Sequence, residues 1–262
     1  MTLTQELAAP ILDQGDAPDS GPKPWGFWAT AALSLVVYGA YALVSVVLAV
    51  VLLVRDDADN LDVALQGAPE ALPSYGFAVL VALVAGGILG TGLVALFAKM
   101  KHGWTARRYL ALEPVPWRVL AAWVGVTVGF LLLYHAASIV IKPQNTAGMY
   151  LDLYESAGYP WLFWLAVVGA APVFEEVFFR GFLFRGLAAS RLGPWGAIVI
   201  SSLAWAVIHF QYDATLIAVL FALGILFGVA RARHGSVTLT IALHMMVNLI
   251  AGLEILLLGS PT

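Results

Sequence analysis

The clearest pattern in the chain is a series of long apolar stretches separated by short polar segments. Apolar runs of about 18 residues are long enough to cross a bilayer as α-helices. Seven stretches approach or exceed this length, and they cover residues 25–54, 75–97, 119–141, 161–189, 195–210, 214–230 and 237–258. The pattern predicts an all-α fold, a polytopic transmembrane helix bundle of about seven to eight spans, since a short or interrupted span escapes this kind of search.

The composition agrees with a membrane protein. Hydrophobic residues make up 61% of the 262 residues and charged residues only 11%, whereas a soluble domain has about a quarter charged residues. The chain contains no cysteine, which excludes disulfides, thiolate metal ligands and a cysteine nucleophile. Nothing in the charge pattern resembles a basic nucleic-acid-binding surface, so the expected partner is the lipid bilayer and no nucleic acid.

The charged loops predict the orientation in the membrane. Basic residues gather in alternate loops: Lys23, Lys99, Lys101, Arg107, Arg108, Arg118, Arg185, Arg191, Arg231 and Arg233. The intervening loops are acidic and contain Asp56, Asp57, Asp59, Asp62, Glu70, Asp152, Glu155 and Asp213. Because Lys and Arg accumulate on the cytoplasmic side, seven spans place the N-terminus in the cytoplasm and the C-terminus outside.

Three segments follow from this pattern. Residues 1–24 form an acidic tail that we expect to be disordered, and they lack the positive start and apolar centre of a cleavable signal peptide. Residues 25–159 hold the first three spans and a basic loop, in which residues 99–118 are expected to form a short interfacial helix and turn. Residues 160–258 form a helical core.

The fourth apolar stretch contains the sequence FEEVFFRGFLFRG, with charged residues at membrane depth, where they are costly. Glu176 and Arg180 are four residues apart, so they share one helix face and can form an ion pair. Glu175 lies about 140° around the helix from Arg180 and is expected to lack that partner. An unpaired carboxylate in a poorly hydrated cavity readily accepts a proton, as a general base must.

Three further polar side chains lie at comparable depth. His209 follows Trp205 by one helical turn, and His244 and Asn248 are also one turn apart. At 1.5 Å per residue from the cytoplasmic helix ends, Glu175 and His209 lie ~21 Å deep and Asn248 ~20 Å, with His244 one turn shallower. These residues are therefore predicted to meet in one cavity, with Trp205 packed along its wall.

Simpler interpretations compete with a catalytic one. The two glutamates and Arg180 could hold helices together as a structural charge network, and each histidine could be a satisfied buried residue. His135 has no companion motif, so we expect a structural hydrogen bond within the bundle. The chain lacks the HExxH motif of zinc proteases, the GxSxG motif of serine hydrolases and any glycine-rich phosphate loop.

The three motifs together resemble the CPBP family of intramembrane proteases. The motifs are Glu175-Glu176-x-x-x-Arg180, Trp205-x-x-x-His209 and His244-x-x-x-Asn248, and the resemblance covers about residues 160 to 252. The family includes CAAX prenyl endopeptidases and bacterial proteins linked to bacteriocin processing and immunity. One departure is Trp205, where phenylalanine is commoner in the family.

The resemblance implies a glutamate-dependent endopeptidase acting on a membrane-associated peptide or protein. Glu175 and His209 would bind and deprotonate water, and His244 and Asn248 would stabilise the oxyanion. Glu176, Arg180 and Trp205 would support them. No cofactor is expected, although some family members are described as metalloproteases and a divalent ion such as zinc is the alternative.

Two other functional classes remain open at the level of sequence. A non-catalytic membrane scaffold or bacteriocin-immunity protein would use the same cavity structurally. A proton-coupled transporter would use the Glu and His side chains as a relay, but the chain lacks paired interrupted half-helices in two repeats. Substrate identity does not follow from the sequence.

Overall fold

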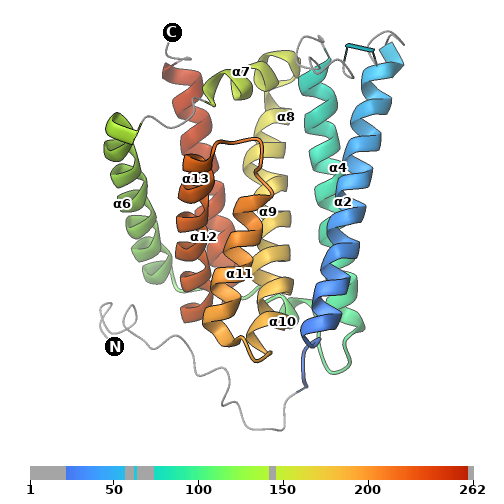
Figure 1. The fold of residues 1–262 in the computed structure, drawn as a ribbon, viewed down its shortest axis with the longest axis vertical. Coiled ribbons are helices and arrows are strands. Elements are labelled where there is room, and N and C mark those ends of the chain that lie inside the picture. Colours follow the sequence, from blue (N-terminus) through green and yellow to red (C-terminus); the bar gives the residue numbers. More distant parts are fainter. Residues whose placement is uncertain (1–21, 57–61, 64–73, 142–145, 259–262) are drawn as a thin grey trace. The chain divides into compact units, whose positions relative to one another are not determined.

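The structure is a computed structural model that describes residues 22–56, 62–63, 74–141 and 146–258 (Figure 1). Every regular element in these ranges is helical. The long helices are α2 (Phe27–Asp56), α4 (Tyr75–Met100), α6 (Trp117–Ile141), α12 (Ala214–His234) and α13 (Val237–Leu258). The shorter separate helices are α5 (Ala106–Tyr109), α7 (Ala147–Ser156) and α11 (Gly193–Val207).

The region from Pro160 to Ala188 is a continuous helix built from five pieces. They are α8 (Pro160–Trp164), the π-helical turn η2 (Leu165–Ala170), α9 (Ala171–Glu176), the π-helical turn η3 (Val177–Leu183) and α10 (Phe184–Ala188). Pro160 occupies the first turn of this helix, where its missing N–H costs nothing.

A helix occupies each of the seven predicted apolar stretches. Six are long and apolar enough to cross a membrane, and α11, with 15 residues, is a shorter apolar helix. The prediction of an all-α transmembrane bundle is therefore confirmed. The last stretch was predicted with the bounds that α13 has, and α4 begins at the predicted residue.

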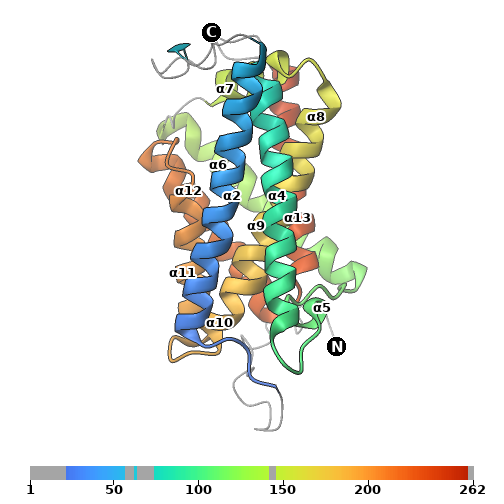
Figure 2. The same cartoon turned by 90° about the vertical axis from the view of Figure 1, so that its right-hand side faces the viewer.

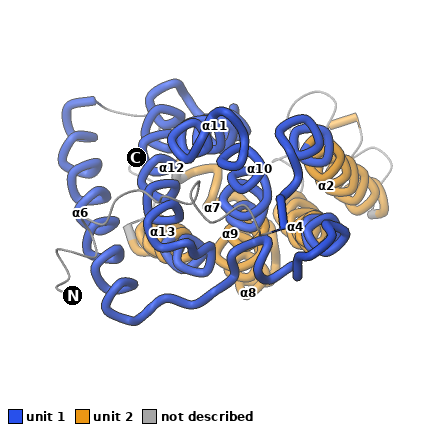
Figure 3. The backbone as a smooth tube through the Cα atoms, turned by 90° about the horizontal axis from the view of Figure 1, so that it is seen from below, with its two compact units in different colours: residues 1–34, 94–144, 175–243 blue, residues 35–93, 145–174, 244–262 orange. Residues whose placement is uncertain are grey.

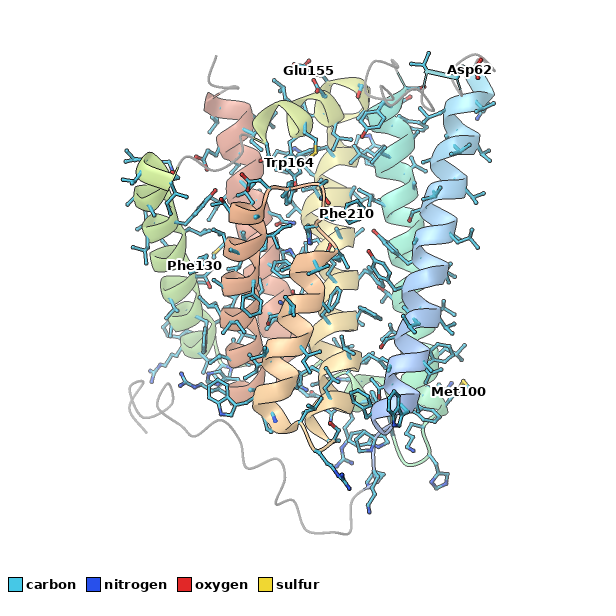
Figure 4. All side chains as sticks on the ribbon, viewed as in Figure 1. Asp62, Met100, Phe130, Glu155, Trp164 and Phe210 are labelled. Atoms are coloured by element: carbon cyan, nitrogen blue, oxygen red, sulfur yellow. The ribbon has the colours of Figure 1, made fainter. Side chains whose placement is uncertain are left out.

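Large apolar side chains are exposed along the spans (Figure 4). Examples are Leu35 and Val47 on α2 and Leu133 and Val140 on α6, each more than half exposed. So much exposed apolar surface on long helices suits contact with lipid chains. His135 on α6 is exposed as well, and the structural hydrogen bond expected for it within the bundle stays a prediction.

The chain divides into two compact units, coloured separately in Figure 3. Unit 1 comprises Met1–Ser34, Val94–Gln144 and Glu175–Leu243, and unit 2 comprises Leu35–Leu93, Asn145–Phe174 and His244–Thr262.

The centre of unit 1 is the packing of α11 against α10, η3 and α12. Its apolar core contains Phe184, Leu187, Ala197, Ile198 and Ala232. The turn between α12 and α13 is specified locally. Gly235 ends α12 in the left-handed region with a φ of 62°, where a side chain would be strained, and the Ser236 hydroxyl accepts the Leu239 N–H at the start of α13.

Within unit 1, an arginine that packs against two aromatic rings holds residues 101–113 in place. The Arg185 guanidinium lies 4.8 Å from the Trp104 ring centroid and 5.6 Å from that of Tyr109, and it donates to the carbonyls of Tyr109 and Arg108. Burial raises the pKa of Tyr109 to about 12, so its phenol stays protonated and accepts the Trp25 backbone N–H. The predicted short interfacial helix is present as α5.

Unit 2 contains the larger parts of α2 and α4, which lie side by side (Figures 1 and 2). The Ser45 hydroxyl on α2 donates to the Ala82 carbonyl on α4 over 3.2 Å. A core of Leu80, Ala157, Leu162, Phe163 and Ala166 joins α4 to α8 and η2. Tyr41 and Phe174 stack with ring centroids 4.5 Å apart.

Several local predictions were wrong. Residues 147–156 form helix α7, although their acidic side chains were taken to indicate a loop. Arg185 and Arg231 lie inside helices rather than in the turns that follow them. The predicted fifth span ends at Val207, so His209 lies in the turn after α11. The acidic tail of residues 1–24 lies almost entirely outside the described residues.

Candidate active site

The two glutamates lie where α9 changes into the π-helical turn η3. Glu175 and Glu176 are the last two residues of α9, and Arg180 lies in the middle of η3. A π-helical turn bonds i to i+5, is rare in proteins and occurs frequently at functional sites. The change of pitch falls within the Glu-Glu-x-x-x-Arg motif itself.

Glu176 and Arg180 form the predicted ion pair. The Arg180 Nη1 atom donates to Glu176 Oε1 over 3.1 Å, and both side chains are fully buried. The Arg180 Nη2 atom donates to the Gly224 carbonyl over 3.4 Å. The guanidinium also lies 4.7 Å from the Trp205 ring centroid, so the arginine is held by charge, by a hydrogen bond and by an aromatic face.

A second buried arginine supports the first and was missed in the sequence. The Arg231 Nε atom donates over 3.0 Å to the backbone carbonyl of Arg180, and its guanidinium lies 5.2 Å from the Phe184 ring centroid. Arg231 was counted among the basic loop residues. Its position one turn before the end of α12, on the face that packs inward, was the signal that could have revealed it.

Glu175 has a partner, contrary to the prediction. The Trp205 Nε1–H donates to Glu175 Oε2 over 2.5 Å, and Glu175 is half-buried while Trp205 is buried. A hydrogen bond to a carboxylate is stronger than one between neutral groups, and the indole can only donate. Trp205 therefore orients the acid and does more than pack along a wall.

Trp205 also holds His209. The His209 Nδ1 atom lies 2.8 Å from the Trp205 backbone carbonyl. A carbonyl only accepts, so Nδ1 carries the proton and, in the neutral ring, Nε2 carries the lone pair. The His209 ring stacks on Tyr212 with centroids 5.9 Å apart. One residue thus orients the acid through its side chain and the imidazole through its backbone.

His244 and Asn248 belong to unit 2 and lie one turn apart on α13. His244 is buried, with 4% of its surface exposed. The Asn248 Nδ2 atom donates over 2.8 Å to the Val167 carbonyl in η2, so a π-helical turn supplies the acceptor. Glu175, Trp205 and His209 are brought together within unit 1, and the meeting of this group with His244 and Asn248 stays a prediction.

Comparison with known proteins gives the family. The model of the type II CAAX prenyl endopeptidase Rce1-like family matches residues 157–250, which contain all three motifs. The chain belongs to the CPBP family of CAAX-type proteases. An "Uncharacterized 24.3 kDa protein" of Escherichia coli is 35% identical over 152 residues, covering 53% of this chain and 67% of the relative.

No solved structure matches the chain. The family match and the apolar helices indicate a multi-pass integral membrane protein of a membrane-embedded protease family.

Proposed function

We propose that the protein is an intramembrane glutamic endopeptidase in which Glu175 activates a water molecule. The observation that supports this most directly is the double role of Trp205, whose indole donates to Glu175 and whose carbonyl orients His209. Trp205 donates to Glu175 and Nδ1 of His209 carries its proton, so we place the attacking water between the Glu175 carboxylate and Nε2 of His209.

The proposed reaction needs only these groups and water. Glu175 takes a proton from water while the water oxygen bonds to the peptide carbonyl carbon, which forms a tetrahedral oxyanion. When the C–N bond breaks, the departing nitrogen takes the proton from Glu175, so the products are an acid and an amine.

The oxyanion is assigned to His244 and Asn248. Imidazole and carboxamide N–H groups that face developing negative charge each stabilise the transition state by about 3–4 kcal/mol. Asn248 has two amide protons, and its bond to the Val167 carbonyl uses one of them, which fixes the direction of the other.

The membrane orientation and the substrate class remain part of the proposal. The basic loops favour a cytoplasmic N-terminus and an external C-terminus, with water entering from the cytoplasmic side. The substrate is a membrane-associated peptide or protein, and a prenylated C-terminus, a leader peptide and a membrane-anchor remnant are the candidates.

The test compares cells that carry the wild type with cells that carry Glu175→Gln. Mass spectrometry of membrane-fraction peptides should show new protein termini in the wild type that vanish in the variant, at equal amounts of inserted protein. Identical sets of termini in the two strains would favour the scaffold or immunity function instead.

The metal-dependent alternative fits the donor set of unit 1 poorly. Glu176 binds Arg180, one oxygen of Glu175 binds Trp205, and Nδ1 of His209 is used as well. Within the described part of unit 1, no group of three or more His, Asp or Glu side chains could hold a metal ion.

Purified protein treated with a strong chelator is expected to retain its peptidase rate within about twofold, since each proposed step uses protein groups only. A loss of rate that added zinc restores would contradict this.

Trp205 gives a further prediction. Trp205→Phe keeps an aromatic ring against Arg180 but removes the N–H that Glu175 accepts. Hydrogen bonds to charged groups contribute about 1.5–3 kcal/mol, so kcat is expected to fall by about tenfold or more. Trp195→Phe, an exposed tryptophan on the same helix, is the control and should cleave like the wild type.

A further inference from the structure

Three side chains of unit 1 converge on a backbone position that has no side chain. An ideal Cβ atom added to Gly224 would lie 3.0 Å from Ser202 Cβ, 3.2 Å from Arg180 Nη2 and 3.2 Å from Trp205 Cε3. Contacts this short are tighter than nearly all that real Cβ atoms make. An alanine at position 224 is accommodated only if its neighbours move.

Two of the three neighbours of Gly224 hold the two glutamates. Arg180 binds Glu176, and Trp205 binds Glu175. Arg180 has no exposed surface and Trp205 has 1%, and they lie against each other. Phe227 also packs against the arginine, with its ring centroid 5.8 Å from the guanidinium. In a packed interior of this kind a displaced side chain transmits its movement to the groups bonded to it.

The Gly224 backbone takes part as well. Its carbonyl accepts the Arg180 Nη2 hydrogen. The same residue therefore binds the guanidinium and, because it has no side chain, leaves the space that the guanidinium occupies. A residue with a side chain keeps the carbonyl but fills the room.

Gly228, one turn further along α12, provides a comparison within the same helix pair. A Cβ atom there would lie 3.0 Å from Ile198 Cγ2, with the Ile198 Cα at 3.5 Å. Ile198 belongs to the apolar core of unit 1, and none of the atoms near this position is polar. The nearest contact is 3.0 Å at both glycines, but only Gly224 lies against the residues that hold the carboxylates.

We propose that Gly224 is a positioning residue of the active site, which fixes Arg180 and Trp205 and through them both glutamates. Its effect on catalysis rests on the proposed function. Its effect on Trp205 does not, because that effect follows from packing alone.

The experiment compares Gly224→Ala with Gly228→Ala in full-length protein. Indole N–H signals are measured by NMR in detergent micelles, with the Trp205 signal assigned from its absence in Trp205→Phe. Gly224→Ala should move the Trp205 signal and lower kcat by about tenfold, since a misplacement of about 1 Å can cost about 100-fold. KM should change little. Gly228→Ala should leave the Trp205 signal in place and kcat within about twofold of the wild type.

A second variant separates local crowding from a general loss of folding. Ser202→Gly combined with Gly224→Ala removes the nearest neighbouring atom and should return the Trp205 signal and kcat toward their wild-type values. An unmoved Trp205 signal in folded Gly224→Ala, or equal changes in the two glycine variants, would overturn the proposal. So would a double variant that does not fold. If the wild type cleaves no peptide, the proposed function fails, and the Trp205 signal alone decides this inference.

Discussion

Replacing Glu175 with glutamine is expected to lower the peptidase kcat by about 1,000-fold, within the range of 10²–10⁴ that general base catalysis contributes. Glutamine has nearly the same shape and retains a carbonyl oxygen that can accept the Trp205 N–H. Its amide cannot take a proton from water. The substitution therefore removes the general base while a side chain of nearly the same shape still fills its position.

Single-turnover cleavage of a peptide identified from the membrane fraction, by protein reconstituted in liposomes, measures this effect. Thermal unfolding of the same samples should give a midpoint close to that of the wild type. Glu175→Asp is the variant to compare with it. Aspartate is still a base, but its carboxylate is one methylene further from the substrate, so this variant should retain more activity than Glu175→Gln. A glutamine variant with full activity would exclude Glu175 as the base.

Removing the guanidinium of the buried pair is expected to reduce stability more than any other single change considered. Arg180→Met leaves the buried Glu176 carboxylate without the Nη1 hydrogen bond that it accepts, and it also removes the bond to the Gly224 carbonyl. Breaking a buried ion pair from one side costs about 3–5 kcal/mol, because the remaining charge was desolvated for its partner.

The matched control changes both members of the pair. Glu176→Gln combined with Arg180→Met removes both charges, and the loss in the free energy of unfolding should be less than half that of Arg180→Met alone. Reversible unfolding in mixed micelles of detergent and denaturant measures both variants. Equal losses in the single and double variants would mean that the pair is not coupled and that packing alone accounts for the arginine.

Hydropathy and helical spacing were sufficient to predict the helical architecture and one contact in the candidate site. The seven apolar stretches were found because lipid requires long apolar helices whatever their partners. The Glu176–Arg180 pair was found because residues four apart meet on any helix, and the contact survives the change of pitch that begins one residue after Glu176.

The partner of Glu175 could not be found in this way. Trp205 is thirty residues away on another helix, and its indole reaches the carboxylate only through the packing of α11 against η3. An apolar sequence also gives no sign of a π-helical turn, because apolar residues are compatible with α-helical and π-helical turns alike. The amphipathic α7 was missed because its acidic residues resemble those of a loop.

The shortness of α11 has a consequence for the lipid around it. A helix of 15 residues rises ~22 Å, about 8 Å less than the ~30 Å hydrocarbon layer that it would cross. Non-helical backbone finds no hydrogen bonds among acyl chains, so the turn beyond α11 must be met by a thinned bilayer, by water or by surrounding protein. Ile208 and His209 are the first residues of that turn, so the imidazole proposed to bind water lies on backbone that cannot face acyl chains.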